Sequence, residues 1–189
     1  MQNKNQLLKM YHELGIILRK GPEHPKGFLL KSGKKSDIYI NIRDLIKYQA
    51  AWSYTIFCLS KLVGDANLKK KNSCILGVPT MGAVLAPIIA YQNQFPLAII
   101  RQHKKDHGVG SEVEGTLNRN IVVIDDVITT GSSILEIENQ YFPNNYDSLN
   151  IFVIVDREQH PFKKVYSLMT LEDIKKYRPK KGRKNENQG

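Results

Sequence analysis

The stretch that decides the fold is IVVIDDVITTGSS, residues 121–133. It begins with a run of apolar, mostly β-branched residues, continues with the adjacent acids Asp125 and Asp126, and ends in a short loop rich in hydroxyl groups. The apolar run predicts a buried strand over residues 121–125, and the residues beyond Gly131 predict a helix near residues 132–141. A strand, a tight loop and a helix in this order form the repeating unit of a parallel α/β sheet.

Segments on both sides have the same rhythm. Further strands are predicted at residues 74–78, 97–101 and 151–155, and further helices at residues 6–20, 49–63 and 82–93. A last helix is expected to begin near Thr170, because Thr170 and Asp173 have the spacing of a capping box. We therefore predict an α/β fold with a mostly parallel central sheet flanked by helices. A single domain is expected over residues 1–175, with a basic tail over residues 176–189.

Charge, hydropathy and cysteine content indicate which classes of protein the chain can belong to. The 189 residues include 28 Lys or Arg and 18 Asp or Glu, a net charge of +10, and much of that excess lies beyond residue 175. We expect the tail to be disordered and solvated, although it could contact nucleic acid or an acidic partner. The N-terminal residues lack the pattern of a secretion signal, no apolar run has the length of a membrane span, and Cys58 and Cys74 lack metal or redox spacing. We expect a cytoplasmic protein.

The loop after residue 128 has the chemistry of a sugar phosphate site. A helix N-terminus presents unpaired N–H groups and partial positive charge, and Gly131 lets the backbone approach a ligand closely. Four hydroxyl side chains add donors: Thr129, Thr130, Ser132 and Ser133. Asp125 and Asp126 suit ribose hydroxyls and a magnesium ion, held directly or through water. The alternative interpretation is that acids before a Ser/Thr-capped helix serve only helix initiation. The sequence lacks the G-x-x-x-x-G-K-[ST] loop of nucleoside triphosphatases.

The whole block resembles the phosphoribosyl pyrophosphate motif of type I phosphoribosyltransferases. Three further blocks resemble the orotate phosphoribosyltransferases of that family: FLLKSGKKSDIYINIR (28–43), IIRQHKKDHGVGSEVEGTL (99–117) and DREQ (156–159). The resemblance implies a small N-terminal hood, formed largely by residues 1–48. It implies transfer of ribose 5-phosphate from phosphoribosyl pyrophosphate to orotate in pyrimidine biosynthesis, giving orotidine 5′-phosphate and pyrophosphate. It also implies Mg²⁺ as cofactor and a homodimer in which a mobile loop is shared across subunits.

Residue roles follow from the same resemblance. The positions implied in catalysis are Lys105, His107, Asp125 and Asp126. The positions implied in substrate binding are Lys31, Tyr39, Ile40, Arg101, Lys104, Thr129, Thr130, Gly131, Ser132, Ser133 and Arg157. Within this second set, Arg157 is expected to bind the orotate carboxylate, because a guanidinium donates two parallel hydrogen bonds.

Two positions depart from the family pattern. Met81, in the turn GVPTMGA (77–83), stands where many members carry lysine, and Gln102 stands where lysine usually follows Arg101. Because one lost transition-state contact costs roughly 10²–10³ in rate, the departures leave the catalytic rate open. Two rival functions also remain open at this point. One is a purine phosphoribosyltransferase, and the other is a non-catalytic regulator that binds phosphoribosyl pyrophosphate and nucleic acid.

Overall fold

The computed structural model describes residues 2–29, 33, 35–101, 112–142 and 146–178. A six-stranded sheet forms its centre, in the order β10-β9-β8-β5-β6-β7. The strands in chain order are β5 (Ser73–Gly77), β6 (Leu97–Ile100), β7 (Val113–Gly115), β8 (Asn120–Ile128), β9 (Ser148–Asp156) and β10 (Val165–Thr170). All neighbouring pairs are parallel except β6 and β7, which are antiparallel. The predicted mostly parallel α/β sheet is confirmed.

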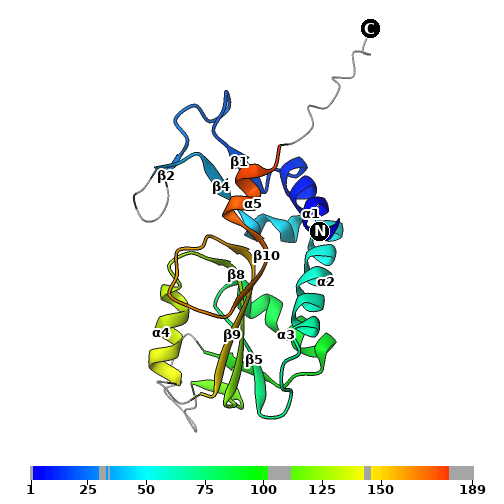
Figure 1. Cartoon of the computed structure of the whole chain (residues 1–189), viewed down its shortest axis with the longest axis vertical. Coiled ribbons are helices and arrows are strands. Elements are labelled where there is room, and N and C mark those ends of the chain that lie inside the picture. The colour runs from blue at the N-terminus through cyan, green and yellow to red at the C-terminus, as the bar shows by residue number, and fades with distance from the viewer. Residues whose placement is uncertain (1, 30–32, 34, 102–111, 143–145, 179–189) are drawn as a thin grey trace.

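Helices cover both faces of the sheet (Figure 1). On one face lie α2 (Gln49–Asp65) and α3 (Met81–Asn93), and on the other lies α4 (Ser132–Tyr141). The central strands are apolar along their length because both faces are buried: residues 73–77 and 121–124 are all buried. Two apolar clusters result, one beneath α2 and α3 and one beneath α4.

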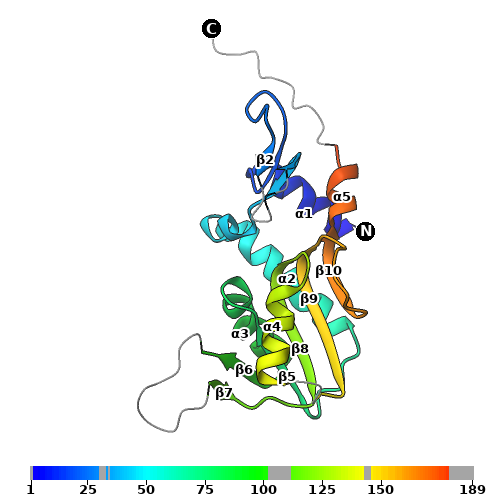
Figure 2. The same ribbon diagram turned by 90° about the vertical axis from the view of Figure 1, so that its left-hand side faces the viewer.

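A small hood stands over the carboxyl ends of the strands (Figure 2). It consists of α1 (Gln2–Glu13), the paired strands β1 (Ile17–Arg19) and β4 (Ile38–Ile40), the hairpin of β2 (Phe28–Leu29) and β3 (Lys35–Ser36), and the 3₁₀ helix η1 (Ile42–Lys47). The final helix α5 (Leu171–Lys176) packs on it. Lys4 pairs with Asp173 at 2.9 Å, and the guanidinium of Arg19 donates to the carbonyls of Ile174 and Tyr177.

The structure corrects the first predicted helix. The predicted helix over residues 6–20 ends at Glu13, and Leu18 lies in β1. Gly15 has a φ of +67°, a left-handed conformation that ends a helix readily. Apolar residues continue past this point because Ile16 and Ile17 pack in the same core cluster as Leu7 and Tyr11 of α1.

Two strands of the six-stranded sheet were not predicted. β7 lies inside the segment expected to be a polar loop, and β10 forms one edge of the sheet. β8 also continues past its predicted end at residue 125, because pairing with β9 extends to Ile128, so both Asp125 and Asp126 lie within the strand. Other predicted elements, including the α5 capping box of Thr170 and Asp173, are confirmed to within a few residues.

No described helix is both long and apolar enough to cross a membrane. Cys58 and Cys74 are buried free thiols, and burial raises the pKa of each.

Candidate active site

The loop after β8 begins the candidate site. Residues 129–131 connect β8 to α4, and Gly131 occupies the N-cap position with a left-handed φ of +75°. Its carbonyl accepts from the N–H groups of Ile134 and Leu135, both at 3.0 Å. No side chain caps α4, so the hydroxyls around its N-terminus do not serve helix initiation. All four are exposed: Thr129, Thr130, Ser132 and Ser133. This geometry disfavours the helix-capping interpretation.

Gly131 is also required by packing. A Cβ atom placed on it would overlap the ring of Phe162, which comes from the segment after β9. Because the backbone is left-handed and the ring lies close, any residue other than glycine would require Phe162 or the loop to move. Phe162 holds the loop at the start of α4 from the side.

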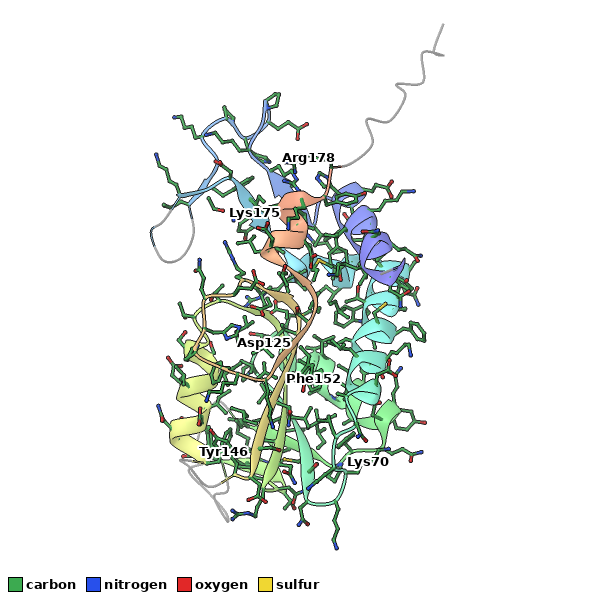
Figure 3. All side chains as sticks on the ribbon, in the orientation of Figure 1. Lys70, Asp125, Tyr146, Phe152, Lys175 and Arg178 are labelled. Atoms are coloured by element: carbon green, nitrogen blue, oxygen red, sulfur yellow. The ribbon has the colours of Figure 1, made fainter. Side chains whose placement is uncertain are left out.

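The two acids of β8 lie side by side at the carboxyl end of the sheet. Figure 3 shows Asp125 nearer to the hood than Lys70, which lies at the far end of the sheet. The backbone N–H of Asp126 donates to Oδ1 of Asp125 at 2.8 Å. Burial raises the pKa of Asp125 well above its usual range, the neighbouring Asp126 raises it further, and Arg43 opposes the shift. The pair thus offers adjacent carboxyl groups whose ionisation a bound cation would favour, and whose oxygens suit ribose hydroxyls.

The turn after β5 packs closely against β8. The N–H of Val78 donates to the carbonyl of Ile124 at 2.9 Å, and a Cβ on Gly82 would overlap that same carbonyl oxygen. The turn includes a cis peptide between Pro79 and Thr80. Met81, at the position where many family members carry lysine, is only 5% exposed. Its side chain belongs to the core and does not take over the role of a lysine.

Two predicted hood residues lie in β4. Tyr39 and Ile40 pair with Leu18 and Ile17 of β1. The Tyr39 ring stacks on Phe28 with centroids 5.6 Å apart. Predicted Lys31 lies outside the described residues.

Two predicted arginines follow strand ends. The N–H of Arg157 donates to the carbonyl of Ile128 at 3.0 Å, which places Arg157 beside the loop at residues 129–131. Burial lowers the pKa of its guanidinium. Arg101 follows β6, and its guanidinium forms an ion pair with Glu114 of β7. The remaining residues predicted in this loop, Gln102, Lys104, Lys105 and His107, lie outside the described residues.

Two residues near the site were not singled out from sequence. Arg43 ends the block at residues 28–43 and acts electrostatically on Asp125. His160 lies four residues after Asp156 and contacts its carboxylate. The signal for Arg43 was its place at the end of a quoted block, whereas His160 resembles an ordinary loop histidine until the fold is known.

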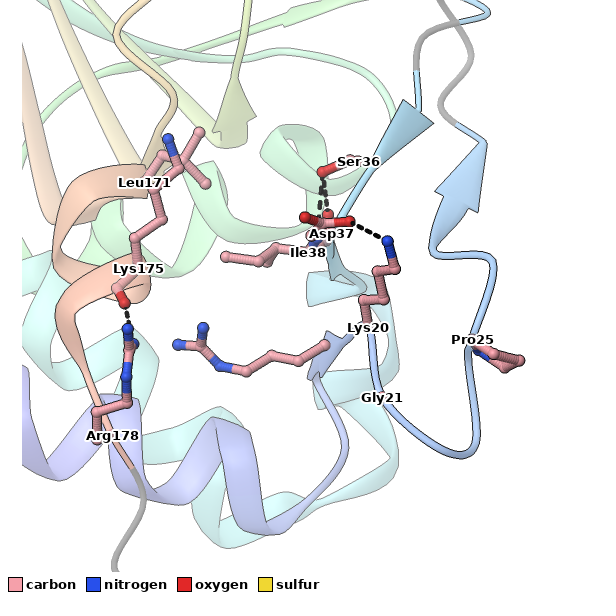
Figure 4. A pocket seen from close by; sticks show the side chains of 10 residues that line it. Lys20, Gly21, Pro25, Ser36, Asp37, Ile38, Leu171, Lys175 and Arg178 are labelled. Atoms are coloured by element: carbon pink, nitrogen blue, oxygen red, sulfur yellow. Dashed lines mark hydrogen bonds and ion pairs between the residues drawn. The ribbon is translucent and has the colours of Figure 1, made fainter.

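A separate cavity of about 870 Å³ lies between the hood and α5 (Figure 4). Its lining includes the cationic side chains Arg19, Lys20, Lys175 and Arg178. None of the residues predicted to bind substrate lines it. Because Arg19 and Arg178 already donate to carbonyls at the end of α5, we assign this cavity to the packing of the hood.

Comparisons with known proteins agree with this geometry. The family model described as a phosphoribosyl transferase domain matches residues 55–178. An orotate phosphoribosyltransferase of Pyrococcus horikoshii is 33% identical over 156 residues, which cover 80% of this chain and 82% of that protein. That of Methanosphaera stadtmanae is 31% identical over 92% of this chain and 97% of its own.

This chain belongs to the orotate phosphoribosyltransferase family. The crystal structure of the orotate phosphoribosyltransferase from Aeropyrum pernix has a TM-score of 0.70 at 31% identity, covering 89% of this chain and 95% of that one. The match includes both the central sheet and most of the hood, so family membership applies to nearly the whole described fold. The predicted family and fold are thereby confirmed.

Proposed function

We propose that this chain transfers ribose 5-phosphate from phosphoribosyl pyrophosphate to orotate, forming orotidine 5′-phosphate and pyrophosphate in pyrimidine biosynthesis. One observation carries the proposal. In a chain of this family, paired acids and an uncapped, hydroxyl-rich helix N-terminus adjoin each other at the carboxyl end of a parallel sheet. Ligands of open α/β sheets bind at that end.

The loop at residues 129–133 would bind the 5′-phosphate. The N-terminus of α4 supplies N–H donors and partial positive charge, and the four exposed hydroxyls supply further donors. Anchoring the phosphate would fix the position of C1′, the atom at which substitution occurs. Such positioning is a large part of catalysis for a two-substrate reaction.

Asp125 and Asp126 would act on the ribose. As the bond between C1′ and the diphosphate breaks, positive charge builds on the sugar ring and negative charge on the leaving group. Two carboxyl groups close to the ring would hold its hydroxyls and stabilise that positive charge. Burial and Asp126 raise the pKa of Asp125, and Arg43 opposes that rise, so Arg43 would favour the ionised form of the acid.

The residues present fit a magnesium ion bound mainly by substrate. Mg²⁺ usually takes one or two protein carboxylates together with substrate phosphates and water. Asp125 and Asp126 can supply the one or two protein carboxylates. The described residues contain no cluster of three or more His, Cys, Asp or Glu side chains that could hold a metal ion. When bound, the ion would neutralise charge on the diphosphate.

Orotate would lie between the hood and the loop after β9. Arg157 would pair with its carboxylate, and the backbone of Tyr39 and Ile40 would contact the ring. Lys31 would lie near the diphosphate. The loop that follows β6 would cover the diphosphate. It would contribute the side chains of Arg101, Lys104, Lys105 and His107.

We also propose that the protein is a homodimer. Exposed apolar side chains lie on α3 and the adjoining strand β6: Tyr91 is 86% exposed, and Val84 and Ile99 are exposed as well. Val84 and Tyr91 are seven residues apart and so share one face of α3. Exposed apolar side chains on one helix face would favour association with another protein surface if they form one patch with Ile99. A second copy would place the loop after β6 within reach of the partner's site.

An orotate consumption assay tests the proposed function. Purified protein with phosphoribosyl pyrophosphate and Mg²⁺ should consume orotate, followed by its ultraviolet absorbance. Hypoxanthine, guanine and adenine in place of orotate should give no nucleotide product. Turnover of a purine without turnover of orotate would reject the proposal.

A double variant tests the acids. Replacing Asp125 and Asp126 by asparagine should lower turnover by roughly 10³-fold or more, because transition-state stabilisation is lost. The circular dichroism spectrum should remain that of the wild type. Near-normal turnover would show that the acids have no role in the reaction.

A further inference from the structure

One buried polar atom in the described part of the chain lacks a partner. It is Nδ1 of His160, whose side chain is 9% exposed. The other ring nitrogen, Nε2, lies 3.1 Å from Oδ1 of Asp156. Buried polar side-chain atoms nearly always have a hydrogen-bond partner, so an orphan atom calls for a partner such as a bound ligand or an ordered water.

His160 lies in a short segment that replaces the usual crossover helix. Residues 157–164 join the parallel strands β9 and β10, a connection that normally takes a dozen or more residues. The carboxylate of Asp156 fixes the start of this segment, because it also accepts from the N–H of Glu158 at 2.6 Å. The imidazole ring is therefore held from one side by a carboxylate that is itself held in place.

The segment brings His160 towards the phosphate loop. The His160 and Phe162 rings have centroids 6.0 Å apart, and the Phe162 ring packs against Gly131 at the N-terminus of α4. Arg157, three residues before His160, is joined through its N–H to Ile128 at the start of the same loop. Two separate contacts thus tie the His160 segment to the loop at residues 128–131.

We infer that Nδ1 of His160 donates a hydrogen bond to the sugar 5′-phosphate. Because the Asp156 carboxylate accepts from Nε2–H, Nδ1 is the nitrogen left for a ligand. With hydrogen on both nitrogens, the ring donates to a carboxylate on one side and to a phosphate oxygen on the other. Such hydrogen bonds between charged groups are the strong ones in proteins. The inference rests on the proposed function, which places the phosphate at this loop.

Two amide variants separate the two ring nitrogens. In His160→Gln the side-chain amide can still reach Asp156 but has no donor at the Nδ1 position. In His160→Asn the amide lies near the Nδ1 position but cannot reach Asp156. We expect His160→Gln to weaken binding of ribose 5-phosphate, measured by calorimetry, by about ten- to a hundred-fold. His160→Asn should retain more of that affinity, and orotate affinity should change by less than about two-fold in both variants.

Selectivity for the phosphorylated ligand distinguishes this role from a structural one. If His160 only supported the position of Arg157, both variants would weaken orotate binding at least as much as ribose 5-phosphate binding. That result, or wild-type affinity for ribose 5-phosphate in His160→Gln, would overturn the inference. Failure of the proposed function would look different: the wild-type protein would consume no orotate at all.

A measurement on the wild-type protein removes any dependence on variant folding. In protein labelled with ¹⁵N-histidine, the Nδ1 resonance of His160 should shift on addition of ribose 5-phosphate, whereas orotate alone should leave it in place. An Nδ1 resonance unchanged by ribose 5-phosphate at saturation would contradict the inference.

Discussion

Asp125 is a carboxyl group in surroundings that oppose its charge. Burial and the adjacent Asp126 raise its pKa, so the folded state holds a proton on this group more tightly than the unfolded state. Its contribution to the free energy of unfolding is therefore lost as the pH rises from about 4, the ordinary aspartate value, through the raised pKa.

Replacement of Asp125 by asparagine should stabilise the fold at neutral pH. The variant keeps an oxygen for the N–H of Asp126 but removes the unfavourable charge. We expect a melting temperature a few degrees above wild type at pH 7, with the difference shrinking towards pH 4. Thermal unfolding followed by circular dichroism across this range is the measurement. A variant that melts below wild type at pH 7 would contradict this explanation.

Gly131 offers a second residue-level prediction with a matched control. Gly131→Ala meets both a positive φ and the Phe162 ring, whereas Gly33→Ala meets a similar φ of +76° with nothing within 4 Å. The backbone term alone costs about 1–2 kcal/mol. Gly131→Ala should therefore unfold at a lower urea concentration than Gly33→Ala. Equal urea midpoints for the two variants would mean that the Phe162 ring moves aside for the new methyl group without a cost in stability.

The residues of the candidate site could be predicted where they lie close together in sequence. The adjacent acids, the hydroxyls and Gly131 lie within nine residues and define their own surroundings. Arg43 and His160 could not be found this way, because the closeness of Arg43 to Asp125, and of the His160 segment to Gly131, exists only in the folded chain. Met81 could be recognised as a departure, but its burial followed only from the structure.

Among the elements, the long buried strands and amphipathic helices were predictable, and the short edge strands were not. β5, β8 and β9 are continuous apolar runs because helices cover them on both sides. β10 is only partly buried along most of its length, and the segment before it has no helical pattern to mark a crossover. β7 has three residues and pairs with one neighbour, so its sequence carries almost no periodic signal.

The capping box of α5 gives a prediction at the level of the element. Thr170 accepts from the N–H of Asp173, and Asp173 accepts from the N–H of Thr170 and from Lys4. Thr170→Ala should cost about 1 kcal/mol of unfolding free energy, whereas Thr170→Ser, which keeps the hydroxyl, should cost much less. Urea denaturation compares them, and indistinguishable variants would mean that the box contributes nothing measurable.

At the scale of the whole molecule, the proposed dimer predicts complementation between damaged subunits. Lys105→Ala would disable the loop, and Asp125→Asn with Asp126→Asn would disable the pocket. If the loop serves the partner's site, each variant alone should be nearly inactive, and an equal mixture should regain roughly a quarter of wild-type turnover. Steady-state assays after subunit exchange measure this. No recovery in a mixture shown to exchange would indicate that each loop serves its own subunit.

The apolar face of α3 can be tested independently. Tyr91→Glu combined with Val84→Glu should convert the dimer to a monomer, because charges on an apolar interface are left without partners. Tyr91→Phe should leave the dimer intact. Light scattering after size exclusion gives the molecular mass. A dimeric double glutamate variant would place the interface elsewhere.

The contacts between α1, β1 and α5 have a consequence for synthesis on the ribosome. Leu7 and Tyr11 share one apolar cluster with Met169 and Ile174, and Arg19 donates to carbonyls at the end of α5. The contacts that α1 and β1 make with α5 can therefore form only after the last segments have been translated. Until then, the surfaces of α1 and β1 that α5 covers stay available to chaperones, and the hood is the last part of the fold to be completed.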